Sequence, residues 1–406
     1  MGRGRPSDLF PTDEPISPQA MIGRADDIDA VAAQLAASAN VIIAAPRRTG
    51  KTTVCDAAVA RLADQDCYVT KLDLFLLSDI DQLSATLIEQ VISNRPLLRH
   101  AVHAAGQAGK TLYESIGITL GAKLADGELD GIDINLLPRL RSDPVAHLDY
   151  ALALPERIAA IDGKRMILCI DEFQDVERIG ESYRRGFADA LKRKMRGVFQ
   201  RSSNVSFLFS GSLEHMMRTI FGSPEEPFFN FGGFHQLGVI TGEQWHTGLT
   251  ERFAGDQTEI DADALELIIT RGAGHPRATM LIAQKAHITS VLATTRHITL
   301  GIARAGYQEA LNAERPKHEA WVDRIQHLAK PAINRVALRS AAAIARGDAP
   351  YRNARTPSEI ARGLQALQNA GFITSAGHSQ GWRLVDPLFS DYLSRLDMTG
   401  PLARGL

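Results

Sequence analysis

The chain has 406 residues, 45% of them hydrophobic, which is enough for two or three domains with buried cores. The chain has 45 Lys and Arg residues and 47 Asp and Glu residues, which gives a net charge of −2. This charge argues against nucleic-acid binding through an overall positive surface, so any such binding would need a local basic face. The three cysteines, Cys55, Cys67 and Cys169, lie in or beside apolar runs without metal-ligand spacing, which predicts buried thiols in a reducing cytoplasm.

The N-terminal residues 1–20 are polar and rich in proline, and they lack the apolar core of a signal peptide. Pro6 stands where a myristoylation signal requires Ser or Thr. No apolar run in the chain is long enough to span a bilayer. We therefore predict a flexible tail over residues 1–20 on a soluble, cytoplasmic protein.

Residues 41–54 read VIIAAPRRTGKTTV. The β-branched run at 41–44 predicts a buried parallel strand, and the apolar spacing from Lys51 onward predicts a helix. A strand, a loop and a helix in this order are typical of a phosphate-binding loop, in which the helix N-terminus faces the phosphates. Ala45 departs from the usual glycine of this pattern, whereas Gly50 is retained. The alternative is an ordinary strand-to-helix turn.

In a phosphate-binding loop, Lys51 reaches the β- and γ-phosphates, Thr52 places its hydroxyl on Mg²⁺, and Thr53 holds the α-phosphate. The remaining predicted ATP-binding residues of the loop are Arg47, Arg48, Thr49 and Gly50.

A second strand is expected over residues 67–75, followed by a long insert at about 94–145 that holds several glycines and a plausible β-hairpin. Such an insert serves either as a contact to a partner or DNA, or as a plain loop. Next, residues 165–174 read RMILCIDEFQ, a strand that ends in Asp171 and Glu172. Carboxylates at the carboxyl edge of a parallel sheet favour Asp171 as a second Mg²⁺ contact and Glu172 as the general base. The alternative is a polar strand terminus.

Residues 191–201, LKRKMRGVFQR, predict a basic helix whose apolar stripe is Leu191, Met195, Val198 and Phe199, with the positive residues facing out. A solvated face is the favoured interpretation, with a nucleic-acid or partner surface as the alternative. The following strand, NVSFLFSGSL at 204–213, ends in Ser210 and Ser212. Ser210 or Ser212 is the predicted sensor of the γ-phosphate, with Ser210 selected as the site residue, and a plain strand-to-turn serine is the alternative.

Three segments, APRRTGKTT, IDEFQ and FSGSLEHMM, together resemble the archaeal-type ATPases of the STAND and AAA+ group of P-loop proteins. The resemblance spans about residues 20–290. It implies that the Met21–Arg24 box, through Ile22, covers the adenine, and that Gly274–Arg277 opens a lid helix. Pro276 would then contact the nucleotide and Arg277 would act as a second γ-phosphate sensor, with a solvated arginine as the alternative. The stretch at 227–233 lacks the arginine finger of many relatives, which leaves Arg218 as a substitute.

Residues 242–315 are expected to be entirely helical, a lid and connector behind the core at 21–241. In residues 316–406, Thr356–Glu359 predicts a capping box, Gly371 a helix stop, and FITS and WRLV a hairpin before a last helix. Helix, helix and hairpin in this order predict a winged helix. Its few cations, Arg355, Arg362 and Arg383, leave both DNA contact and protein docking open.

The predicted fold class is therefore α/β: a P-loop NTPase parallel sheet with helices on both faces, an all-α lid and a C-terminal winged-helix domain. The favoured function is an ATP-binding and ATP-hydrolysing molecular switch that requires Mg²⁺ and moves the winged helix. One alternative is an ATP-gated DNA-binding protein resembling origin initiators or transposition helpers. The other is a nucleotide-holding scaffold without turnover. Protein partners are expected through the winged helix, and the oligomeric state stays open.

Overall fold

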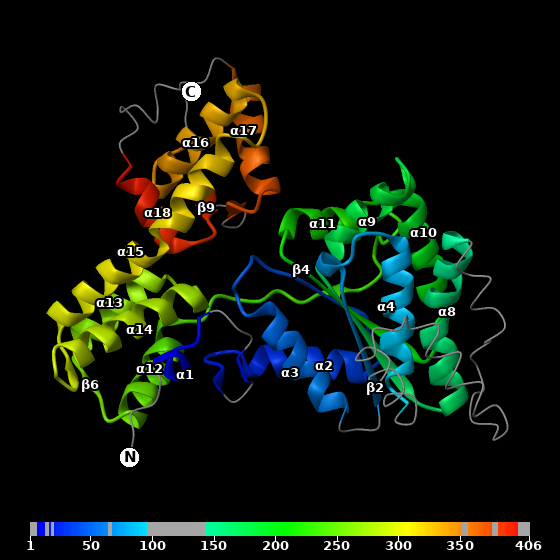
Figure 1. The fold of residues 1–406 in the computed structure, drawn as a ribbon, viewed down its shortest axis with the longest axis horizontal. Coiled ribbons are helices and arrows are strands. Elements are labelled where there is room, and N and C mark those ends of the chain that lie inside the picture. The colour runs from blue at the N-terminus through cyan, green and yellow to red at the C-terminus, as the bar shows by residue number, and fades with distance from the viewer. Residues whose placement is uncertain are drawn as a thin grey trace, which may run out of the picture.

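A five-stranded sheet forms the core of the protein (Figure 1). The computed structural model describes residues 6–12, 16–17, 20–63, 67–95, 143–350, 356–375 and 381–396. The strands are β1 (Val41–Ala44), β2 (Cys67–Asp73), β3 (Arg165–Asp171), β4 (Val205–Gly211) and β5 (Gly233–Phe234). Their order is β2-β3-β4-β1-β5, and every neighbouring pair is parallel. This confirms the predicted P-loop NTPase sheet, in which β4 separates the two strands that carry the main motifs.

Helices cover both faces of the sheet because alternate residues of each strand point to opposite sides. Val41 and Ile43 pack against α2 (Ala25–Ala36) and α3 (Lys51–Ala63). Ile42 and Ala44 belong instead to the larger apolar cluster on the other face. That face is covered by α4 (Ile80–Ile92), α8 (Pro144–Asp162), α9 (Val176–Tyr183), α10 (Phe187–Phe199) and α11 (Glu214–Gly222).

The lid consists mainly of α12 (Gly242–Gly255), α13 (Ala262–Gly272), α14 (Pro276–Leu292) and α15 (Leu300–Ile325). One detail of the prediction was wrong: the lid is not entirely helical, because β6 (Glu259–Ile260) and β7 (His297–Ile298) form a short parallel pair. Helix α15 runs through the predicted domain limit at 315/316 as one helix of 26 residues, with Pro316 inside it.

The N-terminal segment is docked on the lid rather than flexible throughout. Helix α1 (Pro6–Leu9) leads to Phe10, whose ring is fully buried 4.8 Å from the ring of Phe253. Gln284 donates to the Phe10 carbonyl at 3.0 Å, and Arg252 donates to the carbonyls of Leu9 and Ala20. The predicted flexible tail is therefore wrong for residues 6–12, because an aromatic side chain anchors them.

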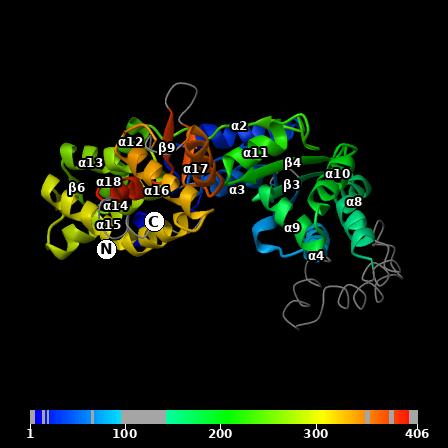
Figure 2. The same cartoon turned by 90° about the horizontal axis from the view of Figure 1, so that it is seen from above.

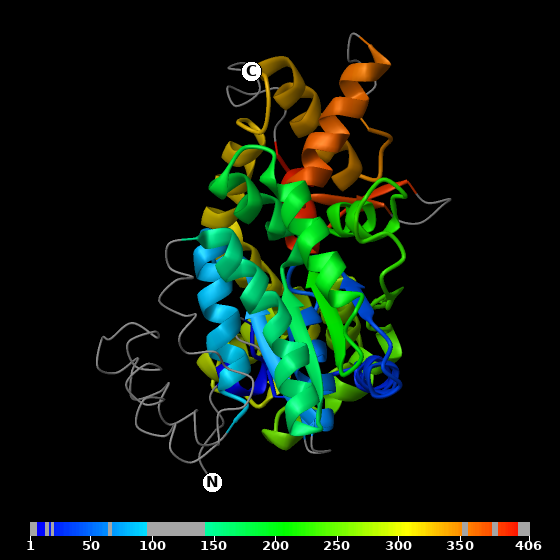
Figure 3. The same ribbon diagram turned by 90° about the vertical axis from the view of Figure 1, so that its right-hand side faces the viewer.

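The C-terminal part holds α16 (Pro331–Ala345), α17 (Pro357–Asn369), the antiparallel hairpin of β8 (Ile373–Ser375) and β9 (Trp382–Leu384), and α18 (Pro387–Ser394). The Thr356–Glu359 capping box and the positive φ of Gly371 are as predicted. Figure 2 shows α17 beside α11 of the core, and in Figure 3 the C-terminal helices lie at the top, above the core. Thr374 donates to Glu214 of α11 at 2.6 Å, and Leu388 of α18 belongs to the apolar cluster of the lid, so this part contacts both core and lid.

Helix α10 corrects one further prediction. Lys192 does not face out: it is buried and lies 2.6 Å from both Glu177 and Glu226. Lys194 pairs with Asp149 and Arg193 with Asp189, so these cations already have acidic partners. The hairpin predicted within the insert at 94–145 lies outside the described residues. Among the described helices, none is both long and apolar enough to cross a membrane.

Candidate functional site

Three predicted site residues converge on the carboxylate of Asp171. Lys51 Nζ lies 3.1 Å from Asp171 Oδ1, and Thr52 Oγ1 donates to Oδ2 at 3.2 Å. Ser210, on the neighbouring strand β4, donates its hydroxyl to Oδ1 at 2.5 Å. These residues come from three separate segments. They meet because β1, β3 and β4 are parallel and end at one edge of the sheet.

Glu172 is held beside this group in an unusual backbone conformation. Its φ of +50° lies in the left-handed region, which a non-glycine residue rarely adopts and which often marks a functional site. Glu172 Oε2 accepts from Ser212 N at 3.0 Å, from Ser212 Oγ at 2.7 Å and from Gln174 Nε2 at 2.5 Å. Ser212 therefore donates its hydrogen bonds to Glu172, whereas Ser210 donates to Asp171. Gln174 was missed as a site residue, although its place in the IDEFQ stretch signalled it.

The charges of the site stabilise one another. Burial lowers the pKa of Lys51, but the Asp171 and Glu172 carboxylates outweigh burial and raise it. Burial likewise opposes the charged forms of both carboxylates, and Lys51 together with the hydrogen bonds from Ser210, Ser212 and Gln174 lowers their pKa values. All three side chains are thus charged at neutral pH. One ammonium against two carboxylates leaves a net negative charge, which suits a divalent cation.

The loop itself explains why an alanine is tolerated at its start. Ala45 is not among the described residues with positive φ, and its N–H donates to the Gly211 carbonyl at 3.2 Å, which continues the ladder between β1 and β4. Gly50 has a φ of +88°, a conformation that favours glycine. Thr49 closes the loop by donating to the Pro46 carbonyl at 2.8 Å. The conformation that requires glycine is therefore at Gly50 and not at Ala45.

Arg24 ties the loop to two other segments and was missed as a site residue. Its side chain is only 4% exposed. It donates to the Thr49 carbonyl at 3.0 Å and to the Gly238 carbonyl at 2.7 Å, and it pairs with Asp27 at 3.0 Å. The Met21–Arg24 motif pointed to this position, but the sequence interpretation selected Ile22 from it.

A cavity of about 480 Å³ opens at the carboxyl edge of the sheet, between the core and the lid. Ile22, Trp245 and Met280 form its apolar side, and Trp245 is buried with no hydrogen-bond partner for its indole N–H among the described residues. A buried donor without a partner beside a cavity favours a ligand with an acceptor at that point. The other predicted site residues that line this cavity are Arg47, Arg48, Thr49, Gly50, Lys51, Thr52, Thr53, Asp171, Glu172, Pro276 and Arg277. Trp245 and Met280 were missed, since nothing local marks them.

Arg277 lines the cavity, and its guanidinium pairs with a carboxylate on a neighbouring lid helix. Both terminal nitrogens donate to Glu314 on α15, at 2.7 and 2.8 Å. The substitute finger residue, Arg218, is not among the residues that line the cavity; it lies on α11 at 3.8 Å from Glu214.

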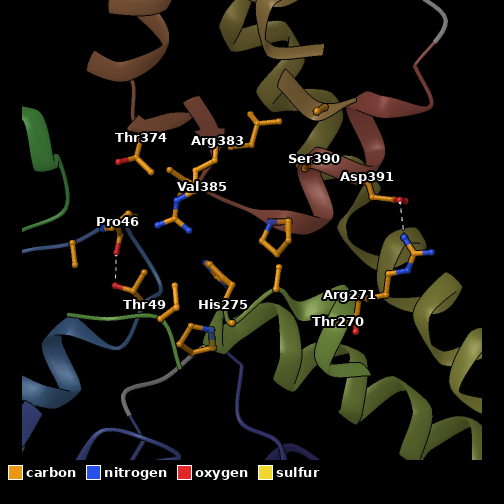
Figure 4. Close-up of a pocket in the computed structure, with 18 of the residues that line it drawn as sticks. Pro46, Thr49, Thr270, Arg271, His275, Thr374, Arg383, Val385, Ser390 and Asp391 are labelled. Carbon is orange, nitrogen blue, oxygen red and sulfur yellow. Dashed lines mark hydrogen bonds and ion pairs between the residues drawn. The ribbon is translucent and has the colours of Figure 1, made fainter. Parts of the chain in front are cut away.

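A second cavity, of about 560 Å³, lies where the loop, the lid and the C-terminal hairpin meet (Figure 4). His275 forms part of its wall, together with Thr49 of the loop and Arg383 of the hairpin. Its Nδ1 accepts from the Ala278 N–H at 3.2 Å, which caps α14, and burial lowers its pKa. A neutral imidazole thus connects the lid turn to the back of the phosphate loop.

Comparison with known proteins supports the fold. No protein-family model matches the chain, and no curated protein matches its sequence. The Walker-type ATPase PABY2304 of Pyrococcus abyssi superimposes with a TM-score of 0.62 at 12% identity, covering 95% of this chain and 99% of that one. The Aeropyrum pernix ORC2 protein in its ADPNP–ADP complexes superimposes with a TM-score of 0.57 at 16% identity, covering 97% and 96%. At these identities the likeness shows a shared fold over nearly the whole chain.

Proposed function

We propose that this chain is an Mg²⁺-dependent ATPase of the STAND/AAA+ type, in which the nucleotide state sets the position of a C-terminal winged-helix domain. The convergence of Lys51, Thr52 and Ser210 on Asp171, with Glu172 held alongside, carries this proposal. One structural neighbour is described as a Walker-type ATPase and another was solved with ADPNP and ADP, which supports nucleotide binding.

The residues present fit Mg²⁺. The Thr52 hydroxyl and the Asp171 carboxylate lie 3.2 Å apart and offer the oxygen ligands that this ion prefers. A bound Mg²⁺ would neutralise phosphate charge as it develops. Lys51 would turn from the two carboxylates toward the β- and γ-phosphates, and the backbone N–H groups at the start of α3 would hold the phosphates as well. Ile22, Trp245 and Pro276 would enclose the adenosine.

Glu172 is the proposed general base. It is deprotonated and oriented by Ser212 and Gln174, so its carboxylate can accept a proton from a water molecule. The water oxygen bonds to the γ-phosphorus, the bond from that phosphorus to the bridging oxygen breaks, and ADP and inorganic phosphate leave. Helix α11 follows Ser212 directly and contacts Thr374 through Glu214, which gives the site a short route to the C-terminal domain.

The test is Mg²⁺-dependent ATP turnover and direct ATP binding by wild type, Lys51→Ala and Glu172→Gln. Lys51→Ala should lose binding and turnover, whereas Glu172→Gln should keep binding and lose turnover by about 10²- to 10⁴-fold. Glu319→Gln is the matched control, because it makes the same change at a side chain that is 52% exposed on α15. A wild type that binds ATP without releasing phosphate would instead establish a nucleotide-holding scaffold.

A second function, ATP-gated DNA binding, is supported by two exposed arginines of the C-terminal domain. Arg362 on α17 and Arg383 beside the second cavity have no ion pair within the described residues. Each phosphate contact should contribute about −0.9 to the slope of log affinity against log salt, so two arginines predict a shallow slope near −2. Stimulation of turnover by duplex DNA, lost in the Arg362→Gln, Arg383→Gln double variant, would establish this function. An ATP turnover rate that does not change on addition of duplex DNA would exclude the DNA-binding function.

A further inference from the structure

A buried charge cluster lies behind the nucleotide cavity and joins the lid to the C-terminal domain. Arg277 on α14 donates to both oxygens of Glu314 on α15, at 2.7 and 2.8 Å. Lys317 donates to the same Glu314 carboxylate and lies 3.4 Å from Asp386 Oδ2. Asp386 in turn accepts two backbone N–H groups at the start of α18. A continuous chain of charges therefore runs from the cavity wall to the last helix.

The cluster is better described as an ion-pair network than as a metal site. One ligand atom each of Glu314, His318 and Asp386 lies within 4.8 Å of the others, which is close enough for a shared cation. However, the two carboxylates are already balanced by the charges of Arg277 and Lys317. A divalent cation would enter beside two positive groups in a buried place, which is electrostatically unfavourable.

We propose that Glu314 is a lock residue, which holds Arg277 away from the γ-phosphate of ATP and must release it before Arg277 can act as a sensor. The proposal rests on the ATPase function proposed above. Arg277 lines the same cavity as Lys51 and Asp171, so its side chain borders the space proposed for the nucleotide. It nevertheless gives both terminal nitrogens to α15.

Carboxylate and phosphate oxygens are alternative bidentate acceptors for one guanidinium, so Glu314 and the γ-phosphate compete for Arg277. ADP has no γ-phosphate and leaves the pair intact. The Arg277–Glu314 lock therefore lowers the affinity for ATP relative to ADP. When ATP takes Arg277, Glu314 keeps only Lys317, and the charge balance around Asp386 changes. Binding of the γ-phosphate thereby alters the electrostatic environment of Asp386 at the start of α18, in the C-terminal domain.

The test compares the Kd values of MgATP and MgADP in hydrolysis-deficient Glu172→Gln protein, with and without Glu314→Gln. The lock predicts that Glu314→Gln tightens ATP binding by about fivefold or more and leaves ADP binding unchanged. Adding Arg277→Gln should abolish this gain, because no guanidinium remains to be released. Glu319→Gln, exposed on the same helix, should change neither Kd.

Glu314→Asp provides a second variant that keeps the buried charge balanced, in case the amide prevents folding. It shortens the side chain, weakens the bidentate pair and should tighten ATP binding by less than Glu314→Gln. Equal shifts for ATP and ADP would overturn the lock, and weaker ATP binding would show that Glu314 positions Arg277 for the phosphate instead. Absence of ATP binding in the parent protein would overturn the ATPase function itself, which separates the two failures.

Discussion

Ser210 on β4 donates its hydroxyl to Asp171 on β3 across 2.5 Å, while Ser212, two residues later, donates to Glu172. The serine on β4 and the serine just after it thus donate to two different carboxylates, one proposed to bind Mg²⁺ and one proposed to accept a proton. This division makes their variants distinguishable.

Ser210→Ala removes a hydrogen bond that lowers the pKa of Asp171 and orients its carboxylate. We expect the Mg²⁺ concentration for half-maximal turnover to rise about tenfold, the effect of one hydrogen bond to a charged group. Ser212→Ala should lower the maximal rate and leave the Mg²⁺ midpoint in place. Mg²⁺ titrations of turnover measure both. A shared response would mean that the two serines act as one unit.

The phosphate loop predicts opposite outcomes for two glycine–alanine exchanges. Gly50→Ala requires an alanine to adopt a φ of +88°. This strain costs about 1–2 kcal/mol and should weaken ATP binding about tenfold. Ala45→Gly should leave ATP binding unchanged and lower the free energy of unfolding by about 0.5–1 kcal/mol, because glycine has more freedom in the unfolded chain. ATP titrations and urea unfolding measure the two effects. If Ala45→Gly bound ATP more tightly than wild type, the conclusion that only Gly50 requires a glycine conformation would be contradicted.

Phe10 should anchor the N-terminal segment to the lid. Phe10→Ala removes a buried ring that packs against Phe253 and His287, and we expect a loss of about 3 kcal/mol or more in lid stability. Hydrogen exchange of α12 and α14 should rise accordingly. Pro11, Thr12 and Ile16 line the cavity, so ATP binding should weaken as well. Leu292→Ala, at a lid side chain that is 80% exposed, is the control and should change neither property.

His318 should make stability depend on pH. Its side chain is 0% exposed, both ring nitrogens lack hydrogen-bond partners among the described residues, and burial lowers its pKa to about 4. The charged groups that face it are Asp386, Lys317, Glu314 and Arg277. Between pH 6.5 and 4 the unfolded chain binds a proton at this histidine and the folded chain does not. The free energy of unfolding should therefore fall by up to about 3 kcal/mol as the pH decreases through this range.

Urea unfolding of wild type and His318→Gln at several pH values between 7.5 and 4.5 measures this effect. The variant should show a flatter pH dependence, and the difference isolates His318 from His275, whose pKa is also lowered. His327→Gln is the control, because that ring is 71% exposed. Equal slopes in wild type and His318→Gln would contradict the prediction.

The sequence was sufficient for the parts of the fold that depend on local patterns. The β-branched run of β1 indicates a strand, the capping box at Thr356 makes its hydrogen bonds within four residues, and the polar ends of β3 and β4 have to meet once the sheet is parallel. Partners that lie far apart in the chain were not predictable. Nothing near Arg277 indicates that Glu314, on another helix, will bind it. Nothing in the polar N-terminal stretch indicates that the Phe10 ring will pack against the lid.

Other details of the fold also have no local signal in the sequence. Helix α15 runs through the predicted domain limit at 315/316 as one helix, with Pro316 inside it. The two-residue strands β6 and β7 are too short to carry a periodic signal, so only the tertiary structure defines them.

The continuity of α15 also determines how far a small motion at the nucleotide can reach. A helix of 26 residues, at 1.5 Å per residue, is a stiff rod about 39 Å long. One end belongs to the lid, and the other end packs into the C-terminal domain with Phe389. If the lid tilts by about 10° when it closes, the far end of such a rod swings by roughly 7 Å. In the proposed ATPase cycle, the helix would therefore act as a lever arm that converts a small adjustment at one phosphate into a displacement large enough for another molecule to recognise.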